Sequence, residues 1–164
     1  NLSFNDRVNT AVSIVIKQYP YAKLYEADGV ALGGPTKDPT KIDHIKVIFY
    51  NVNKTTVFIS ETSPGNFSPP ILFDKEWLGD IIIDWPIGMD LYQANRLKEA
   101  AGFTKPYETV FLRNPFFRPK LGNPLFIFGN GSLQFILVDT VTGNVTSGNM
   151  SHPVLRRFEN NNNY

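Results

Sequence analysis

The chain has 164 residues, of which 42% are hydrophobic, so it is long enough to bury one sizeable core or two small cores that share an interface. Its 16 basic and 15 acidic residues nearly balance and form no basic run, which argues against nucleic acid or an anionic membrane as the partner. The absence of cysteine excludes thiolate metal sites and thiol nucleophiles, and no apolar run approaches the roughly 18 residues that cross a bilayer, so we expect no membrane span.

Residues 3–19 predict an amphipathic helix. Ser3 and Asp6 form a capping pair at its start, and Pro20 ends it. Apolar side chains recur at steps of three and four, as one helical face requires: Phe4, Val8, Ala11, Val12, Val15 and Tyr19.

Residues 46–68, KVIFYNVNKTTVFISETSPGNFS, recur as residues 124–146, PLFIFGNGSLQFILVDTVTGNVT, without a gap at an offset of 78. Each copy predicts a strand, a tight polar turn, a returning strand and a second turn that carries a glycine, Gly65 or Gly143. A capped helix precedes each copy, and a further strand lies between that helix and the copy. The sequence therefore predicts an internal duplication.

The expected fold class is α+β, with two repeated units of one helix packed on an antiparallel three-stranded sheet and joined into one compact body. We place the first unit at 3–68, a docked connector at 69–87, the second unit at 88–147 and a partly disordered tail at 148–164. The expected strands are 22–31, 42–50 and 55–60 in the first unit, and 107–113, 124–128 and 133–139 in the second. The second helix follows Asp90, and Gly102 ends it. In the connector we expect a helical turn at 73–78 and a short buried strand at 80–85.

Asn-X-Ser/Thr sequons occur six times, whereas chance predicts about two. Most fall at predicted turns or strand ends, where a glycan can lie in solvent. The chain also opens on Asn1-Leu-Ser without Met, as a mature secreted chain does. We expect a secreted, extracellular glycoprotein; the alternative is an Asn-rich intracellular protein with accidental sequons. The candidate glycosylation sites are Asn1, Asn53, Asn66, Asn130, Asn144 and Asn149.

Residues 133–146, LQFILVDTVTGNVT, resemble the closing strand of PepSY domains, in which an apolar strand is followed by an acidic residue and a Thr-Gly turn. The matching residues are Asp139, Thr142, Gly143 and Val145, while the first copy keeps an acidic residue and the glycine. The resemblance covers about two thirds of the chain as two tandem, cystatin-like units of a helix and an antiparallel sheet. It implies an inhibitory or chaperoning protein that binds a peptidase or another protein and has no chemistry of its own.

No catalytic constellation is evident, and we predict no catalytic residue, metal or cofactor. His44 and His152 are the chain's two histidines: Asp43 and His44 are expected on opposite faces of a strand and cannot pair simply, and His152 lies in the tail before Pro153, so a zinc site or a serine triad is not indicated. Asp80 and Asp84 lie about 13 Å apart if they share a strand, which is too wide for the usual pair of glycosidase carboxylates. We interpret both as solvated side chains at the ends of the apolar run 81–83.

The loop at 113–120 is the most suggestive surface, because two adjacent phenylalanines stand among basic residues and prolines. Aromatic and guanidinium groups of this kind anchor protein interfaces; here they are Arg113, Phe116, Phe117, Arg118 and Lys120. The alternative is that the phenylalanines fold back over the edge of the sheet.

The function predicted is therefore binding of another protein, most concretely inhibition of a secreted peptidase. The first alternative is an apolar-ligand-binding protein or an enzyme that uses the concave face of the sheet. The second is a cell-wall or matrix protein.

Overall fold

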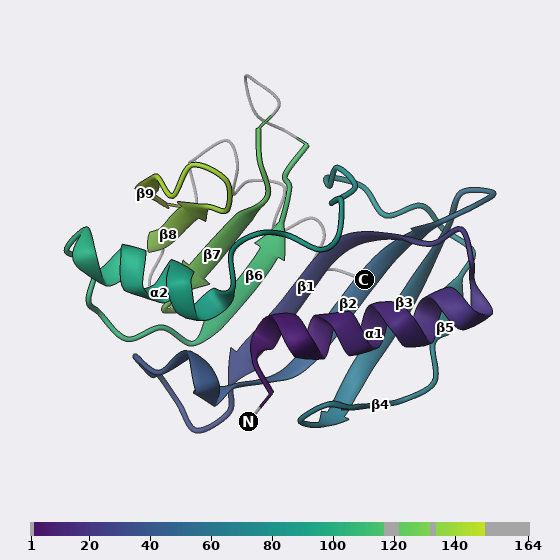
Figure 1. Ribbon diagram of the computed structural model, residues 1–164, viewed down its shortest axis with the longest axis horizontal. Helices are drawn as coiled ribbons and strands as arrows, with labels where there is room; N and C mark the ends of the chain where they lie inside the picture. The colour runs from purple at the N-terminus through teal and green to yellow at the C-terminus, as the bar shows by residue number, and fades with distance from the viewer. Residues whose placement is uncertain (1, 117–121, 132–133, 150–164) are drawn as a thin grey trace.

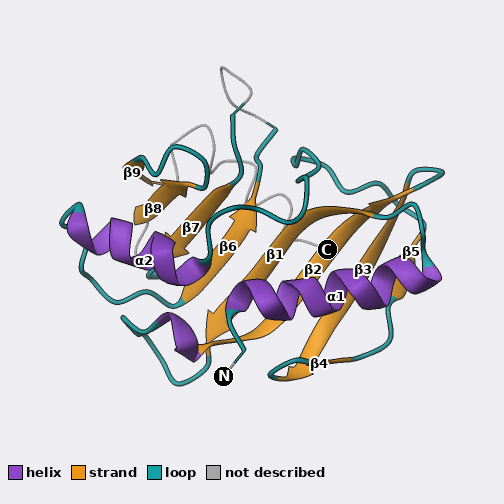
Figure 2. Ribbon diagram, in the orientation of Figure 1, coloured by secondary structure: helices purple, strands orange, loops and turns teal. Residues whose placement is uncertain are grey.

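The computed structural model describes residues 2–116, 122–131 and 134–149, and these form one α+β body (Figure 1). In these residues it has two α-helices, a short 3-10 helix and a nine-stranded antiparallel sheet (Figure 2). The elements are, in chain order, α1 (Phe4–Gln18), β1 (Lys23–Ala31), η1 (Pro39–Lys41), β2 (Ile42–Asn51), β3 (Thr55–Ser63), β4 (Asn66–Phe67), β5 (Ile71–Phe73), α2 (Leu91–Ala100), β6 (Thr109–Arg113), β7 (Leu125–Gly129), β8 (Gln134–Asp139) and β9 (Val145–Asn149).

The sheet is continuous, in the order β4-β3-β2-β1-β6-β7-β8-β9, with β5 pairing on β3 beside β4. Its centre is the antiparallel pair of β1 and β6, in which Ala27 lies opposite Leu112 and Glu26 opposite Arg113. Figure 1 shows both helices on the same face of this sheet. The predicted α+β class and the single compact body are confirmed.

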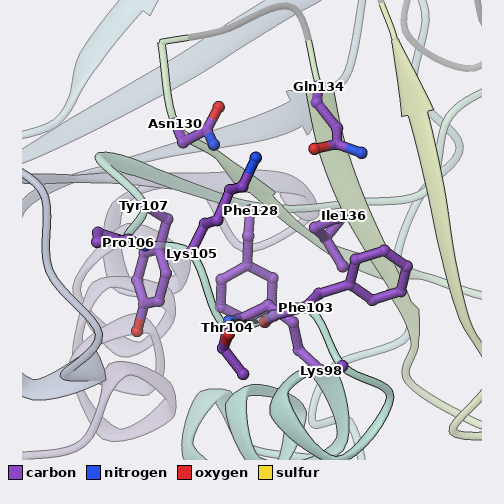
Figure 3. Close-up of a pocket in the computed structure, with 11 residues that line it drawn as sticks. Lys98, Phe103, Thr104, Lys105, Pro106, Tyr107, Phe128, Asn130, Gln134 and Ile136 are labelled. Carbon is purple, nitrogen blue, oxygen red and sulfur yellow. Dashed lines mark hydrogen bonds between the residues drawn. The ribbon is translucent and has the colours of Figure 1, made fainter.

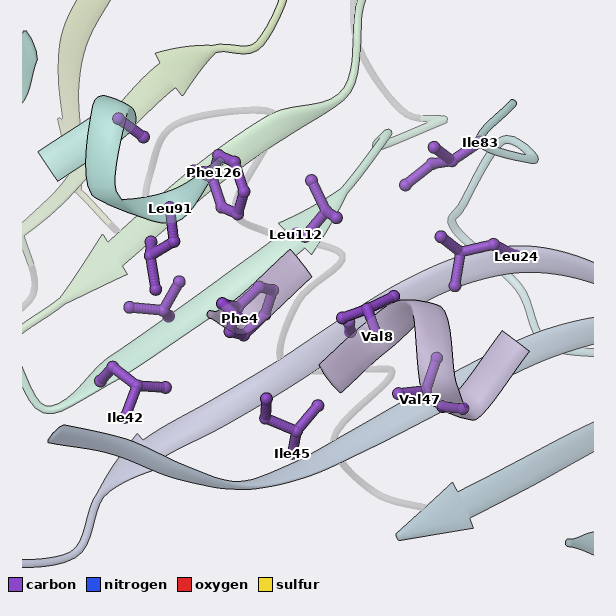
Figure 4. Close-up of a cluster of buried hydrophobic side chains, with 14 of the residues drawn as sticks. Phe4, Val8, Leu24, Ile42, Ile45, Val47, Ile83, Leu91, Leu112 and Phe126 are labelled. Carbon is purple, nitrogen blue, oxygen red and sulfur yellow. The ribbon is translucent and has the colours of Figure 1, made fainter. Parts of the chain in front are cut away.

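Helix α1 begins and ends close to where its pattern predicts. The Ser3 hydroxyl accepts a hydrogen bond from the Asp6 amide at 3.1 Å, and the Asp6 carboxylate accepts one from the Ser3 amide at 3.3 Å, which completes the capping box. Of the predicted stripe, Phe4, Val8, Ala11 and Val15 are buried, and Val12 and Tyr19 are partly buried. The stripe packs on inward-facing residues of the central strands, including Ile45 and Val47, to form the main core (Figure 4).

The two hairpins repeat their pairing at an offset of 79 residues, one more than the ungapped sequence match. Val47 lies opposite Ile59 in the first hairpin, and Phe126 lies opposite Val138 in the second. The glycine turns keep the offset of 78, with Gly65 at φ +80° and Gly143 at φ +76°. The difference of one residue coincides with a bulge between β3 and β4, after Glu61.

The predicted secondary structure of the connector is wrong. The short strand expected at 80–85 is replaced by two isolated bridges, Asp80 with Pro115 and Ile83 with Leu24. The helical turn expected at 73–78 does not form: residue 73 is the end of strand β5, and 74–78 has no regular secondary structure. The connector does dock, because Trp77 and Ile83 are both buried. Strands β4, β5 and β9 were not predicted, and most of the predicted tail, 150–164, lies outside the described residues.

A buried ion pair fastens α1 to the sheet. The Arg7 guanidinium donates from Nε to Glu61 Oε2 at 2.7 Å and from Nη2 to Glu61 Oε1, and it also donates to the Ile42 carbonyl at 2.8 Å. Asp43 adds a longer contact of 3.2 Å to Nη2. Glu61 also accepts from the Gly65 amide, so one carboxylate holds both the helix and the glycine turn.

Replacing Arg7 by Met should lower the free energy of unfolding by about 3–5 kcal/mol, because Glu61 is then a buried charge without a partner. The double variant Arg7→Met/Glu61→Gln should lose less than Arg7→Met alone. Urea unfolding of Arg7→Met, Glu61→Gln and the double variant measures these losses. A loss in the double variant equal to the sum of the two single losses would contradict the coupling between Arg7 and Glu61.

Candidate functional site

A cavity of about 300 Å³ lies between the C-terminal end of α2, the segment after it and the β7–β8 hairpin (Figure 3). We call it the α2 cavity. Its residues come from two stretches of the chain, the end of α2 with the segment that follows it and the β7–β8 hairpin. They are Lys98, Gly102, Phe103, Thr104, Lys105, Pro106, Tyr107, Phe128, Asn130, Gln134 and Ile136.

The cavity forms beside a helix that is too short to cover the sheet below it. Helix α2 has 10 residues and α1 has 15, which correspond to about 15 Å and 22 Å. Gly102 ends α2 with φ +93°, and the Phe103 amide then donates back to the Lys98 carbonyl at 3.2 Å. Phe128 and Ile136, on neighbouring strands, are therefore left facing the cavity.

Three aromatic rings, those of Phe103, Tyr107 and Phe128, line the cavity. The ring of Tyr107 meets the ring of Phe128 edge to face, with centroids 4.9 Å apart. Backbone hydrogen bonds of 2.9 Å in both directions join Tyr107 to Thr36 and fix this wall. Figure 3 shows Lys98, Phe103 and Phe128 gathered at one end of the cavity, with Lys105, Asn130 and Gln134 at the other. Thr104 also lies at the first end, so polar groups occur at both ends of the cavity (Figure 3).

Lys98 is the unusual residue of the site, since it is only 1% exposed. Its Nζ donates to the Phe103 carbonyl at 2.8 Å and lies 5.2 Å and 5.4 Å from the ring centroids of Tyr107 and Phe128. Burial lowers the pKa of this amine; Glu99 opposes the effect, and Lys37 adds to it.

Tyr107 is 2% exposed, and its hydroxyl has no hydrogen-bond partner among the described residues. Burial, assisted by Asp38 and Glu99, raises the pKa of the hydroxyl, so it stays protonated at physiological pH. The α2 cavity therefore offers apolar surface, one buried amine and a few hydrogen-bonding groups. No group of three or more His, Asp or Glu side chains in 2–116, 122–131 or 134–149 is arranged so that it could hold a metal ion.

The predicted interface residues do not stay together. Arg113 is the last residue of β6 and is 1% exposed, so it does not belong to a surface anchor, contrary to the prediction. Phe116 is 60% exposed, as the prediction requires. Phe117, Arg118 and Lys120 lie outside the described residues.

Arg113 instead belongs to a buried ionic cluster on the face of the sheet opposite the helices. Its Nε donates to Asp80 Oδ1 at 2.7 Å, and Trp77 Nε1 donates to Asp80 Oδ2 at 2.7 Å and to Glu26 Oε1 at 3.1 Å. Asp28 lies one residue beyond Ala27 on the same strand face as Glu26. Asp80 was predicted to be solvated, and this is wrong: its side chain is fully buried and ties the connector to the sheet.

The cluster holds three carboxyl groups against one guanidinium. Burial, and then repulsion by Asp28, raises the pKa of Glu26 to about 8, while burial raises the pKa of Asp28 to about 6. Burial and Glu26 also raise the pKa of Asp80, although Arg113 opposes them. Glu26 is therefore mostly protonated at neutral pH and can share its proton within the cluster.

The sequence reading did not single out the residues of the α2 cavity. One signal was available for Lys98, which lies seven residues after Leu91 and four after Ala94, on the buried stripe of α2. His44 is exposed, with φ +50° at an irregular point of β2. Neither of the two α-helices of the described chain is long and apolar enough to cross a membrane.

The raised pKa values predict that the protein becomes less stable as pH rises from about 5 to 8. In that window the unfolded chain has already released the protons that the folded cluster still binds, so each group lowers the free energy of unfolding by up to about 1.4 kcal/mol per pH unit until its own folded pKa is passed, about 6 for Asp28 and about 8 for Glu26. The lowered pKa values of Glu61 and Asp139 act only at more acidic pH, where their contribution is lost.

Glu26→Gln should flatten this dependence, because the amide oxygen can still accept from Trp77 and no proton is bound. Urea unfolding of wild type and Glu26→Gln at pH 5, 6.5 and 8 gives the difference between their free energies of unfolding. The two histidines are common to both proteins and do not contribute to this difference. A wild-type stability that rises over this range relative to Glu26→Gln would show that the cluster is ionised.

Comparison with known proteins gives no match: no family model, no curated protein and no solved structure matches the chain. The resemblance to PepSY domains thus stays a prediction. The function is argued below from the residues and geometry of the chain itself.

Proposed function

We propose that the protein is a non-enzymatic binding protein and that the α2 cavity takes up a small, mainly apolar molecule. The observation that carries this proposal is the cavity's wall of Phe103, Tyr107, Phe128 and Ile136, which is left open between α2 and the sheet. A volume of about 300 Å³ is at the lower end of the range for ligand sites, which suits a compact ligand of one or two rings. The few polar groups can orient such a ligand, as in most small-molecule sites.

The neutral fluorescent probe N-phenyl-1-naphthylamine tests this proposal, because its emission rises when it enters an apolar site. Ile136→Trp places a large ring in the cavity and should weaken binding by about tenfold or more. Val141→Trp is the matched control, since Val141 is 70% exposed and does not line the cavity. Equal binding by wild type and both variants would place the probe elsewhere and contradict the proposal.

We also propose that the fold arose from two copies of one helix and three strands. Three observations support this. First, each half of the chain has the order helix, strand and hairpin. Second, the residue pairs of the first hairpin recur in the second hairpin 79 residues later. Third, at the centre, Ala27 pairs with Val47 and Leu112 with Phe126, so Ala27 and Leu112 are equivalent, and they lie opposite each other. This pairing is what a two-fold axis through the β1–β6 pair would produce. A helix and an antiparallel sheet in each copy agree with the PepSY resemblance.

A second candidate function is protein binding, most concretely the inhibition of a secreted peptidase. It is favoured by β5, an edge strand whose three apolar residues are all exposed: Ile71 by 58%, Leu72 by 49% and Phe73 by 44%. Proteins usually shield such edges, and an unshielded edge can add a strand from a partner. In the predicted interface loop, which is separate from β5, Phe116 is 60% exposed and is also available to a partner.

Secretion and glycosylation belong to this proposal. Among the sequons, Asn53, Asn66 and Asn144 are exposed and can carry a glycan, whereas Asn130 is half-buried at the α2 cavity. Asn1 lies outside the described residues, as does the side chain of Asn149.

If β5 captures a peptidase, Leu72→Lys should weaken inhibition at least tenfold, because the edge strand then carries a charge. Inhibition constants against a panel of secreted peptidases measure this, with Val141→Lys as the exposed control. No inhibition by wild type, or inhibition unchanged by Leu72→Lys, would remove β5 from the account; self-association alone would favour a matrix role.

A further inference from the structure

The ammonium group of Lys98 is incompletely satisfied. It has three donors, and the structure gives it one acceptor, the Phe103 carbonyl at 2.8 Å. The rings of Tyr107 and Phe128 flank it, and rings interact with a cation but accept hydrogen bonds only weakly. The residue is 1% exposed, so water can supply few of the remaining acceptors, and the group that lies beside Lys98 in the α2 cavity has to supply them.

The charge of Lys98 has no partner either. No carboxylate within the described residues comes within ion-pair distance of its Nζ. Glu99, on the same helix, acts on it only from a distance, and Lys37 repels it. Lys105 lines the same cavity and adds a second positive charge, while the Tyr107 hydroxyl is neutral. The Phe103 carbonyl and the two rings compensate this cation only in part, and a buried charge without an ion-pair partner is costly in an apolar site.

We infer that the ligand of the α2 cavity carries a carboxylate and that Lys98 is the residue that pairs with it. This inference rests on the proposed function and specifies its ligand class, a compact aromatic acid. The rings of Phe103, Phe128 and Tyr107 would contact the apolar body. A carboxylate oxygen would accept from Lys98 Nζ and satisfy the missing hydrogen bonds. Thr104, Asn130 and Gln134 are the uncharged polar groups that can contact the rest of the molecule.

Two consequences distinguish an acid from a neutral ligand of the same shape. First, the acid gains a charge-assisted hydrogen bond in a water-poor site, which is worth about tenfold to a hundredfold in affinity. Second, the carboxylate stabilises the charged amine, so binding should be accompanied by proton uptake at alkaline pH, where part of Lys98 is neutral.

The test compares 2-naphthoic acid with 2-naphthylmethanol, which share a ring system and differ in charge. Competition against N-phenyl-1-naphthylamine gives both affinities. Wild type should prefer the acid by about tenfold to a hundredfold, and Lys98→Met should bind the two alike. Arg96→Met removes a positive charge from the exposed face of the same helix and should keep the preference.

Calorimetry at increasingly alkaline pH, in buffers of different ionisation enthalpy, supplies a readout that needs no variant. The acid should take up protons on binding and the alcohol should not. Equal affinities of wild type for acid and alcohol would overturn the inference while leaving the cavity as a site for neutral ligands. A preference for the acid that Lys98→Met retains would also overturn it. Failure of the alcohol, the acid and the probe to bind would overturn the proposed function and this inference together.

Discussion

The antiparallel pairing of β1 with β6 is the constraint on which the rest of the structure depends. Ala27 and Leu112 are fully buried where the two strands meet, so the first and second parts of the chain share one sheet and one main core. Each part alone would have a small sheet with an open edge at β1 or β6, and an exposed edge of this kind invites aggregation. The pairing removes both edges, and it puts α1 and α2 on the same face.

The same pairing brings charged side chains together on the other face. Glu26 lies directly opposite Arg113, and Asp28 is two residues from Glu26 along β1. Burying this cluster requires a cover with matching polar groups, and the connector provides them through Trp77 and Asp80. The connector is therefore irregular, because its side chains and carbonyl groups must contact this cluster. Because the cluster holds more carboxyl groups than cations, we expect the stability of the protein to depend on pH.

Both α-helices and strands β1, β2, β3, β6, β7 and β8 were predicted from the sequence within a few residues of their ends, and the site was not. Local signals define α1 and the glycine turns, because capping and periodicity act between residues close in the chain. The cavity depends on the difference in length between α1 and α2, and on Phe128 and Ile136 lying under the end of α2, which only the tertiary packing determines. Asp80 looked solvated because its partner, Arg113, is 33 residues away. Arg113 likewise looked like a surface residue, since nothing nearby in the sequence reveals the carboxylates that bury it.

The central claim is that the functional site is the α2 cavity, with Lys98 as its charged contact. Amide chemical-shift mapping of the ¹⁵N-labelled protein during titration with 2-naphthoic acid tests it most directly. The account predicts saturable shifts concentrated in residues 98–107, in β7 at Phe128 and in β8 at Ile136. Shifts concentrated on β5, or scattered without saturation, would contradict it.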